Sequence, residues 1–128
     1  MLDHITFGVG DFDRALSFYD QALAPLGVER LVLITAEMTG GTAYVGYGEA
    51  GRPYFWFHGE GATTGTMHVA FSAASRTMVD AFYAAALAAG GTDNGAPGLR
   101  PHYDPNYYGA FVLDPEGRNI EAVCRKGE

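Results

Sequence analysis

The sequence predicts an α+β domain built from two consecutive copies of a βαβββ unit. The main observation is an internal repeat, because residues 68–91 align without a gap on residues 4–27, with eight identical pairs in 24 positions. In both copies an apolar, strand-like segment precedes a segment of helical periodicity. A repeat of this kind indicates a duplicated supersecondary unit. The first identical pair is His4 with His68, and histidine is the commonest metal-ligating side chain.

Length and composition indicate one globular domain. The 128 residues suit a single domain, 1–128, with module 1 at 1–58 and module 2 at 66–126. The net charge of −7 disfavours nucleic acid as a partner. The chain has no apolar run that would span a bilayer, so we expect neither a membrane span nor a signal peptide. The single cysteine, Cys124, fits a reducing compartment, and we expect a cytoplasmic protein.

Module 1 opens with an alternating segment, 3–9, which predicts a strand. Asp11 can cap the helix that follows, and Pro25 with Gly27 ends it. Further strands are expected at 28–37, 42–47 and 54–58.

Module 2 repeats this order, with a strand at 67–72 and a helix that Ser75 caps and Gly90-Gly91 ends. A weak strand is expected near 93–99, and 100–107 is expected to be a loop. The last hairpin is expected at 108–113 and 119–125, around the turn 114–117.

Glu121 lies in the last strand, out of phase with its apolar neighbours Ile120, Ala122 and Cys124. If those three residues pack on the helices, Glu121 points to the concave side of the sheet. A buried carboxylate needs a cation or several hydrogen-bond donors. Two histidines and one carboxylate meeting there would hold a divalent metal and leave positions open for substrate.

His4, His68 and the segment Asp114–Glu121 (DPEGRNIE) resemble the vicinal oxygen chelate superfamily, the group of glyoxalases, bleomycin resistance proteins and extradiol dioxygenases. The resemblance covers nearly the whole chain. It implies two βαβββ modules forming a cup-shaped, barrel-like mixed sheet around a metal. It also implies His4, His68 and Glu121 as ligands of a divalent ion (Fe, Mn, Zn or Ni), and a homodimer in which a site can draw on both chains.

Glyoxalase I-like members of that superfamily use a fourth ligand, on the fourth strand. Matching Gly51-Arg52 with Gly117-Arg118 places Phe55 at the position of Glu121, and phenylalanine cannot ligate a metal. A slip of one residue would instead turn Trp56 and His58 inward, and His58 could then bind the metal. We favour the first register, which resembles the three-ligand members.

Aromatic residues, Tyr44 and Tyr107 among them, are expected to surround the metal. His102 and Tyr103, in the loop before the seventh strand, are candidates for proton transfer to a bound substrate. The candidates for substrate binding are Tyr47, Phe55, Phe57, Arg100 and Tyr108. Because Arg100 is the only nearby cation expected from the loop, the substrate is expected to be neutral or monoanionic.

Two functions follow from these expectations, and a third possibility is a degenerate module whose site is vestigial. The first is a metal-dependent lyase or dioxygenase whose small organic substrate chelates the metal through vicinal oxygens. The alternative is a metal-free, bleomycin-resistance-like binder that sequesters an aromatic small molecule.

Overall fold

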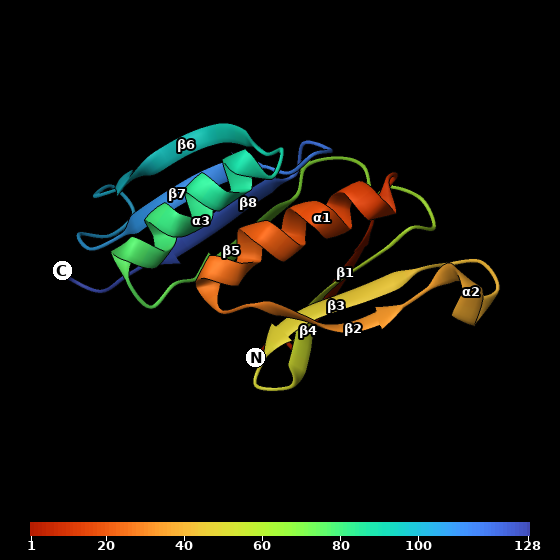
Figure 1. Ribbon diagram of the computed structural model, residues 1–128. Helices are drawn as coiled ribbons and strands as arrows, with labels where there is room; N and C mark the ends of the chain where they lie inside the picture. The colour runs from red at the N-terminus through yellow and green to blue at the C-terminus, as the bar shows by residue number, and fades with distance from the viewer.

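The computed structural model describes residues 1–128 and contains two four-stranded mixed sheets, as Figure 1 shows. The sheets have the orders β1-β4-β3-β2 and β5-β8-β7-β6, and they do not close into a barrel. The first module contains β1 (Ile5–Gly8), α1 (Phe12–Leu23), η1 (Ala24–Leu26), β2 (Glu29–Ile34), α2 (Ala36–Thr39), β3 (Tyr44–Glu49) and β4 (Arg52–His58). The second contains β5 (His68–Ser72), α3 (Arg76–Ala88), β6 (Thr92–Leu99), β7 (Tyr108–Leu113) and β8 (Asn119–Cys124). The predicted duplicated α+β fold is confirmed.

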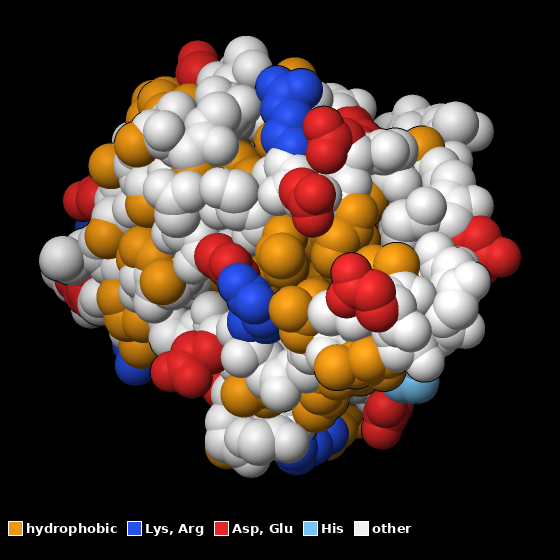
Figure 2. All heavy atoms as spheres, turned by 45° about the vertical axis from the view of Figure 1, so that its right-hand side comes forward, with side chains coloured by type: hydrophobic (Ala, Val, Ile, Leu, Met, Phe, Trp, Pro, Cys, Tyr) orange, Lys and Arg blue, Asp and Glu red, His pale blue; other side chains and the backbone are white.

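Helices α1 and α3 lie side by side, and each covers one face of its own sheet (Figure 1). Their apolar stripes and the facing strand residues form one core cluster of 23 buried residues. Each sheet therefore has a buried helix side and an open side. No helix is both long and apolar enough to cross a membrane. On the face drawn in Figure 2, apolar side chains gather near the middle and acidic side chains are scattered around them.

The two main helices begin where the capping residues predict. The Asp11 carboxylate accepts a hydrogen bond from the Arg14 amide at 3.1 Å, and the Ser75 hydroxyl accepts one from the Met78 amide at 3.2 Å. Each cap satisfies an amide at the start of its helix that has no partner within the helix. The weak strand expected near 93–99 is also present, as β6.

The strand expected at 28–37 is shorter than predicted. It ends at Ile34, because Thr35 caps the one-turn helix α2 by accepting a hydrogen bond from the Met38 amide at 3.3 Å. A capped turn competes with strand pairing, and composition alone did not reveal the cap.

The register expected for β4 is wrong by one residue. Tyr47 pairs with Phe55 but Gly48 pairs with Pro53, so Tyr54 is an extra, bulged residue in β4. Beyond the bulge, every side chain of β4 points to the face opposite the one expected from matching Gly51-Arg52 with Gly117-Arg118.

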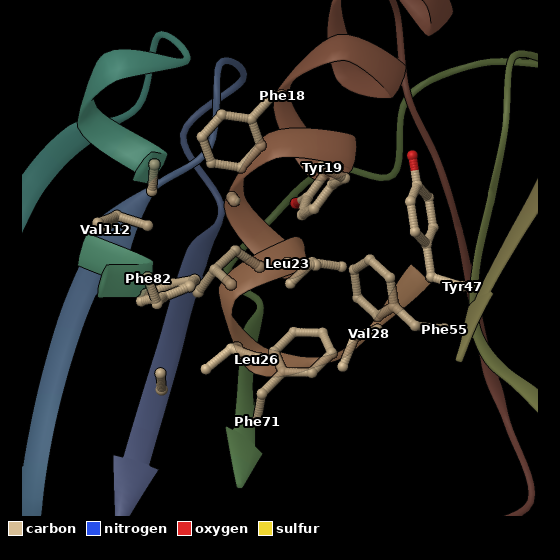
Figure 3. Packing of buried hydrophobic residues seen from close by; sticks show 14 of the residues in the cluster. Phe18, Tyr19, Leu23, Leu26, Val28, Tyr47, Phe55, Phe71, Phe82 and Val112 are labelled. Atoms are coloured by element: carbon tan, nitrogen blue, oxygen red, sulfur yellow. The ribbon is translucent and has the colours of Figure 1, made fainter. Parts of the chain in front are cut away.

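Strand pairing gives the corrected equivalence between the modules. Ile5 pairs with Phe55 in the first sheet, and Val69 pairs with Ile120 in the second. Phe55 therefore corresponds to Ile120, on the helix side, and the next residue, Trp56, corresponds to Glu121. Figure 3 shows Phe55 among the core residues.

The turn between β7 and β8 forms hydrogen bonds that connect module 2 to module 1. Arg118 donates from Nη2 to the Gly8 carbonyl at 2.8 Å and from Nη1 to Asp114 Oδ2 at 3.3 Å. Asp114 Oδ2 also accepts a hydrogen bond from the Tyr19 hydroxyl at 2.6 Å. The Asp114 and Arg118 side chains are only 1% and 6% exposed, so this ion pair is part of the interior.

Glu116, in the same turn, binds the chain just before α1. Its carboxylate accepts hydrogen bonds from the Gly10 amide at 2.9 Å and the Asp11 amide at 2.8 Å. Partial burial acts to raise the pKa of the Glu116 carboxyl, but these amides and the Arg118 guanidinium together lower that pKa below its ordinary value. The charged form of Glu116 therefore stabilises the contact between the modules.

We expect Glu116→Gln to lower the free energy of unfolding at pH 7 by about 1 kcal/mol, the usual effect of losing a carboxylate acceptor at the start of a helix. A carboxyl with a lowered pKa stabilises the fold above its unfolded pKa, about 4.3, and this contribution is lost as the pH falls through the folded pKa. The difference from wild type should therefore shrink as the pH is lowered below about 4 in urea titrations.

Glu60→Gln is the matched control, because it makes the same charge change at an exposed carboxylate that has no hydrogen bond or ion pair. If both variants lose the same stability at pH 7, the contact between Glu116 and the two amides is not a stabilising one.

Candidate metal and substrate site

His68 and Glu121 meet on the open side of the second sheet. Their strands, β5 and β8, are parallel neighbours, and His68 Nε2 lies 2.8 Å from Glu121 Oε1. Ile120, Ala122 and Cys124 are buried in the core, so strand alternation directs Glu121 to the opposite face, as predicted. The side chain of Glu121 is 1% exposed and that of His68 is 47% exposed. A buried carboxylate therefore lies under a half-exposed imidazole.

Tyr107 binds the second oxygen of the same carboxylate. Its hydroxyl donates a short hydrogen bond to Glu121 Oε2. Burial, with the neighbouring Glu121 carboxylate, raises the pKa of Tyr107 to about 12, so the phenol keeps its proton at neutral pH. Gly109 leaves the space for this contact, because a Cβ there would lie 3.1 Å from both Glu121 Oε2 and Tyr107 Cε1.

A hollow of about 450 Å³ opens above this pair. The loop between β6 and β7 supplies one wall, where the His102 and Tyr103 rings lie 4.2 Å apart between centroids and the Tyr103 and Tyr107 rings lie 5.0 Å apart. The hollow, called the β8 pocket below, is lined by His68, His102, Tyr103, Tyr107, Phe111, Glu121 and Arg125. Four of the predicted site residues, His68, His102, Tyr103 and Glu121, therefore come together in a single chain.

His4 lies elsewhere. Its side chain is 55% exposed, and Nδ1 is 2.7 Å from Asp3 Oδ1. It lines a separate hollow of about 310 Å³ between β1 and β5, together with Tyr54 and Val69 among others. Within one chain no three His, Cys, Asp or Glu side chains are grouped closely enough to hold a metal ion.

Three residues expected to bind substrate lie on the helix sides of their sheets instead. Tyr47 and Phe57 are fully buried on the helix side of the first sheet, where the Tyr47 hydroxyl donates to Asp20 at 2.8 Å (Figure 3 shows Tyr47). Tyr108 faces α3, and its hydroxyl donates to Asp80 at 2.6 Å. Strand alternation explains these corrections, because all three have the same phase as core residues of their strands.

Neither Phe55 nor Arg100 lines the β8 pocket, although each lies close to a hollow. Phe55 is 1% exposed and packs in the core, although its edge reaches the hollow beside His4. Arg100 lies with its guanidinium carbon 5.5 Å from the centre of the Phe111 ring and donates to the carbonyls of Gly98 and Ala96, both at 2.8 Å. It flanks the β8 pocket without lining it.

Trp56 and His58, the residues of the alternative register, lie on the open side of the first sheet. Trp56 packs on Gly46, where a Cβ would lie 2.8 Å from the indole ring. The His58 ring lies 5.7 Å from that of Tyr44 and accepts a hydrogen bond from the Glu60 amide at 3.1 Å. The position equivalent to Glu121 thus carries an indole, which cannot ligate a metal.

The sequence predicted Tyr107 as part of the aromatic surroundings of the site but assigned no role to Phe111 or Arg125, and all three line the β8 pocket. Phe111 pairs directly with Glu121 across β7 and β8, a neighbour that the predicted hairpin could have revealed. The contact of Tyr107 with Glu121 depends on the loop conformation and had no sequence signal.

We expect Tyr107→Phe to lower the free energy of unfolding, measured in urea with a metal chelator present, by about 1–3 kcal/mol, because it removes a donor from a buried carboxylate. Tyr103→Phe is the control, since Tyr103 is 60% exposed and its hydroxyl has no hydrogen bond within the protein. Equal stability of Tyr107→Phe and wild type would show that Glu121 does not depend on this hydroxyl.

Comparison with known proteins supports the same architecture. The family model "Glyoxalase/Bleomycin resistance protein/Dioxygenase superfamily" matches residues 1–122. A glyoxalase/bleomycin resistance protein from Albidiferax ferrireducens T118 is 30% identical, with a TM-score of 0.73 over 97% of this chain and 98% of that one. No curated protein sequence matches the chain.

Two more distant structures share the fold. A glyoxalase/bleomycin resistance protein/dioxygenase family enzyme from Burkholderia phytofirmans PsJN is 19% identical, with a TM-score of 0.70 over 98% of both chains. Glyoxalase I from Zea mays is 21% identical, with a TM-score of 0.72 over 97% of this chain, which spans 46% of the maize chain. The chain belongs to the glyoxalase/bleomycin resistance protein/dioxygenase superfamily.

Proposed function

We propose that this protein is a divalent-metal-dependent enzyme that acts on a small organic molecule with vicinal oxygens. The observation that carries the proposal is that the Glu121 carboxylate is buried without a basic side chain to neutralise it. The other buried side-chain carboxylate, that of Asp114, is paired with the buried guanidinium of Arg118. Glu121 has no Arg or Lys partner, and its carboxylate is hydrogen-bonded only to His68 and the Tyr107 hydroxyl. A buried carboxylate beside an imidazole nitrogen suits a divalent cation.

The third ligand in this proposal is His4 of a second copy. His68 and Glu121 supply one nitrogen and one oxygen, whereas His4 of the same chain lines a different hollow. A two-fold dimer that sets module 1 of one chain against module 2 of the other would complete two equivalent sites. The exposure of His4 leaves its imidazole available for such a contact.

The metal would supply Lewis-acid binding of the vicinal oxygens, with Fe, Mn, Zn and Ni as the candidate ions. Tyr107 would hold the Glu121 carboxylate in place for ligation. His102 and Tyr103, on the loop over the β8 pocket, would exchange protons with the substrate. The aromatic wall of the pocket would exclude water from one side of the bound molecule. The single buried cysteine, Cys124, supports a cytoplasmic location.

A second candidate function is a metal-free binder of aromatic molecules. It is favoured by the hydrogen bonds of Glu121, because both carboxylate oxygens already have partners without a metal. The aromatic lining of the β8 pocket would serve such a binder equally well.

Metal analysis of protein purified without a histidine tag tests the first candidate. We expect about one divalent ion per chain in wild type and loss of that ion in His4→Ala, His68→Ala and Glu121→Ala, since each removes a ligand. Metal-free wild-type protein that still binds aromatic ligands would support the second candidate.

Mixed oligomers test whether two chains share a site. His4→Ala and Glu121→Ala proteins, unfolded together and refolded at equal concentrations, should recover about a quarter of the wild-type metal content. Half of the dimers would then be mixed, and each mixed dimer would hold one intact site. If all ligands came from one chain, the mixture would bind no more metal than either variant alone.

A further inference from the structure

The outer end of the β8 pocket carries a guanidinium that has no hydrogen-bond or ion-pair partner within the chain. Arg125 follows β8 directly and has the same strand phase as Glu121, so both side chains line the pocket. Arg125 is exposed, and it takes part in no hydrogen bond or ion pair within the protein. The guanidinium groups of Arg30 and Arg118 pair with Asp20 and Asp114, whereas those of Arg14, Arg52 and Arg76, like that of Arg125, have no such partner. Arg125 differs from these three because it lines the β8 pocket.

Tyr107 connects this guanidinium to the metal-binding end of the pocket. The Arg125 guanidinium carbon lies 4.8 Å from the centre of the Tyr107 ring, and the hydroxyl of the same ring binds Glu121. Cation–π stacking orients the guanidinium but leaves its N–H groups free. Arg125 is therefore held at a set position relative to Glu121 and available to an anion.

We propose that Arg125 binds a carboxylate of the substrate, at the end of the pocket away from its vicinal oxygens. This inference rests on the proposed function only in assuming that the substrate carries vicinal oxygens. The planar fork of an arginine matches a carboxylate in two parallel hydrogen bonds. The rings of His102, Tyr103 and Phe111 line the same pocket as Arg125 and Glu121. The ligand class is therefore a flat organic monoanion.

The charge balance favours a single negative charge on the ligand. Arg100, the other arginine near the pocket, already donates to two backbone carbonyls. The protein has a net charge of −7, and acidic side chains are spread over the face shown in Figure 2. A single free guanidinium in the pocket of an acidic protein suits a carboxylate, whereas a phosphate or phosphonate dianion needs several cations.

Two flat probes of closely similar shape, one anionic and one neutral, test this inference: 4-hydroxybenzoate and its isostere 4-hydroxybenzamide. Their affinities are measured by isothermal titration calorimetry on wild type, Arg125→Ala, Arg125→Lys and Lys126→Ala. Lys126→Ala is the matched control, because it removes the same charge from the next residue, which does not line the pocket.

We expect wild type and Lys126→Ala to bind the benzoate about tenfold more tightly than the benzamide, in a salt-dependent way. Arg125→Ala should lose that preference, and Arg125→Lys should retain only part of it because a lysine cannot form the bidentate pair. Equal affinity for both probes in wild type, absence of benzoate binding, or an equal loss in Lys126→Ala would overturn the inference.

The metal content of the same preparations separates this inference from the proposed function. Arg125→Ala should keep the metal content of wild type. A protein without metal that still prefers the benzoate contradicts the proposed function but not the carboxylate site. A metal-loaded protein without the preference contradicts only the carboxylate site.

Discussion

The alternation of β8 between a buried side and an open side is the constraint on which the site depends. Burial of Ile120, Ala122 and Cys124 against the helices leaves Glu121 no orientation except toward the opposite face. The same phase brings Arg125 into the pocket. A slip of one residue would bury Arg125 against the helices and place Ile120 in the pocket, so the apolar core selects the register that creates the polar site.

The two buried carboxylates of module 2 have different charge partners. Asp114 accepts a hydrogen bond from the Tyr19 hydroxyl and is neutralised by Arg118, and this group joins the end of β1 to the β7–β8 turn. Glu121 also accepts a hydrogen bond from a tyrosine hydroxyl, but its only cationic partner would be a half-exposed histidine. The first arrangement is complete within the chain and structural, whereas the second is open to an added cation.

The duplicated modules have diverged on their open sides while keeping similar helix sides. The helices retain the matched pairs Phe18-Tyr19 and Phe82-Tyr83, and Phe18 and Phe82 are both fully buried. On the open side, Trp56 in the first sheet stands where Glu121 stands in the second. The first module therefore contributes aromatic surface, and the polar chemistry is concentrated in the second. Packing constrains the helix sides, while the open sides are free to specialise.

The sequence alone determined the duplicated architecture, the helix caps at Asp11 and Ser75, and the orientation of Glu121, because these depend on local periodicity and capping. Only the tertiary structure decided the rest. It revealed the bulge at Tyr54, which reverses the faces of β4, and it placed Tyr47, Phe57 and Tyr108 on the helix sides of their sheets. It also separated His4 from His68 and brought Tyr107 to Glu121. Such contacts join residues through loops and strand pairings whose geometry no local pattern encodes.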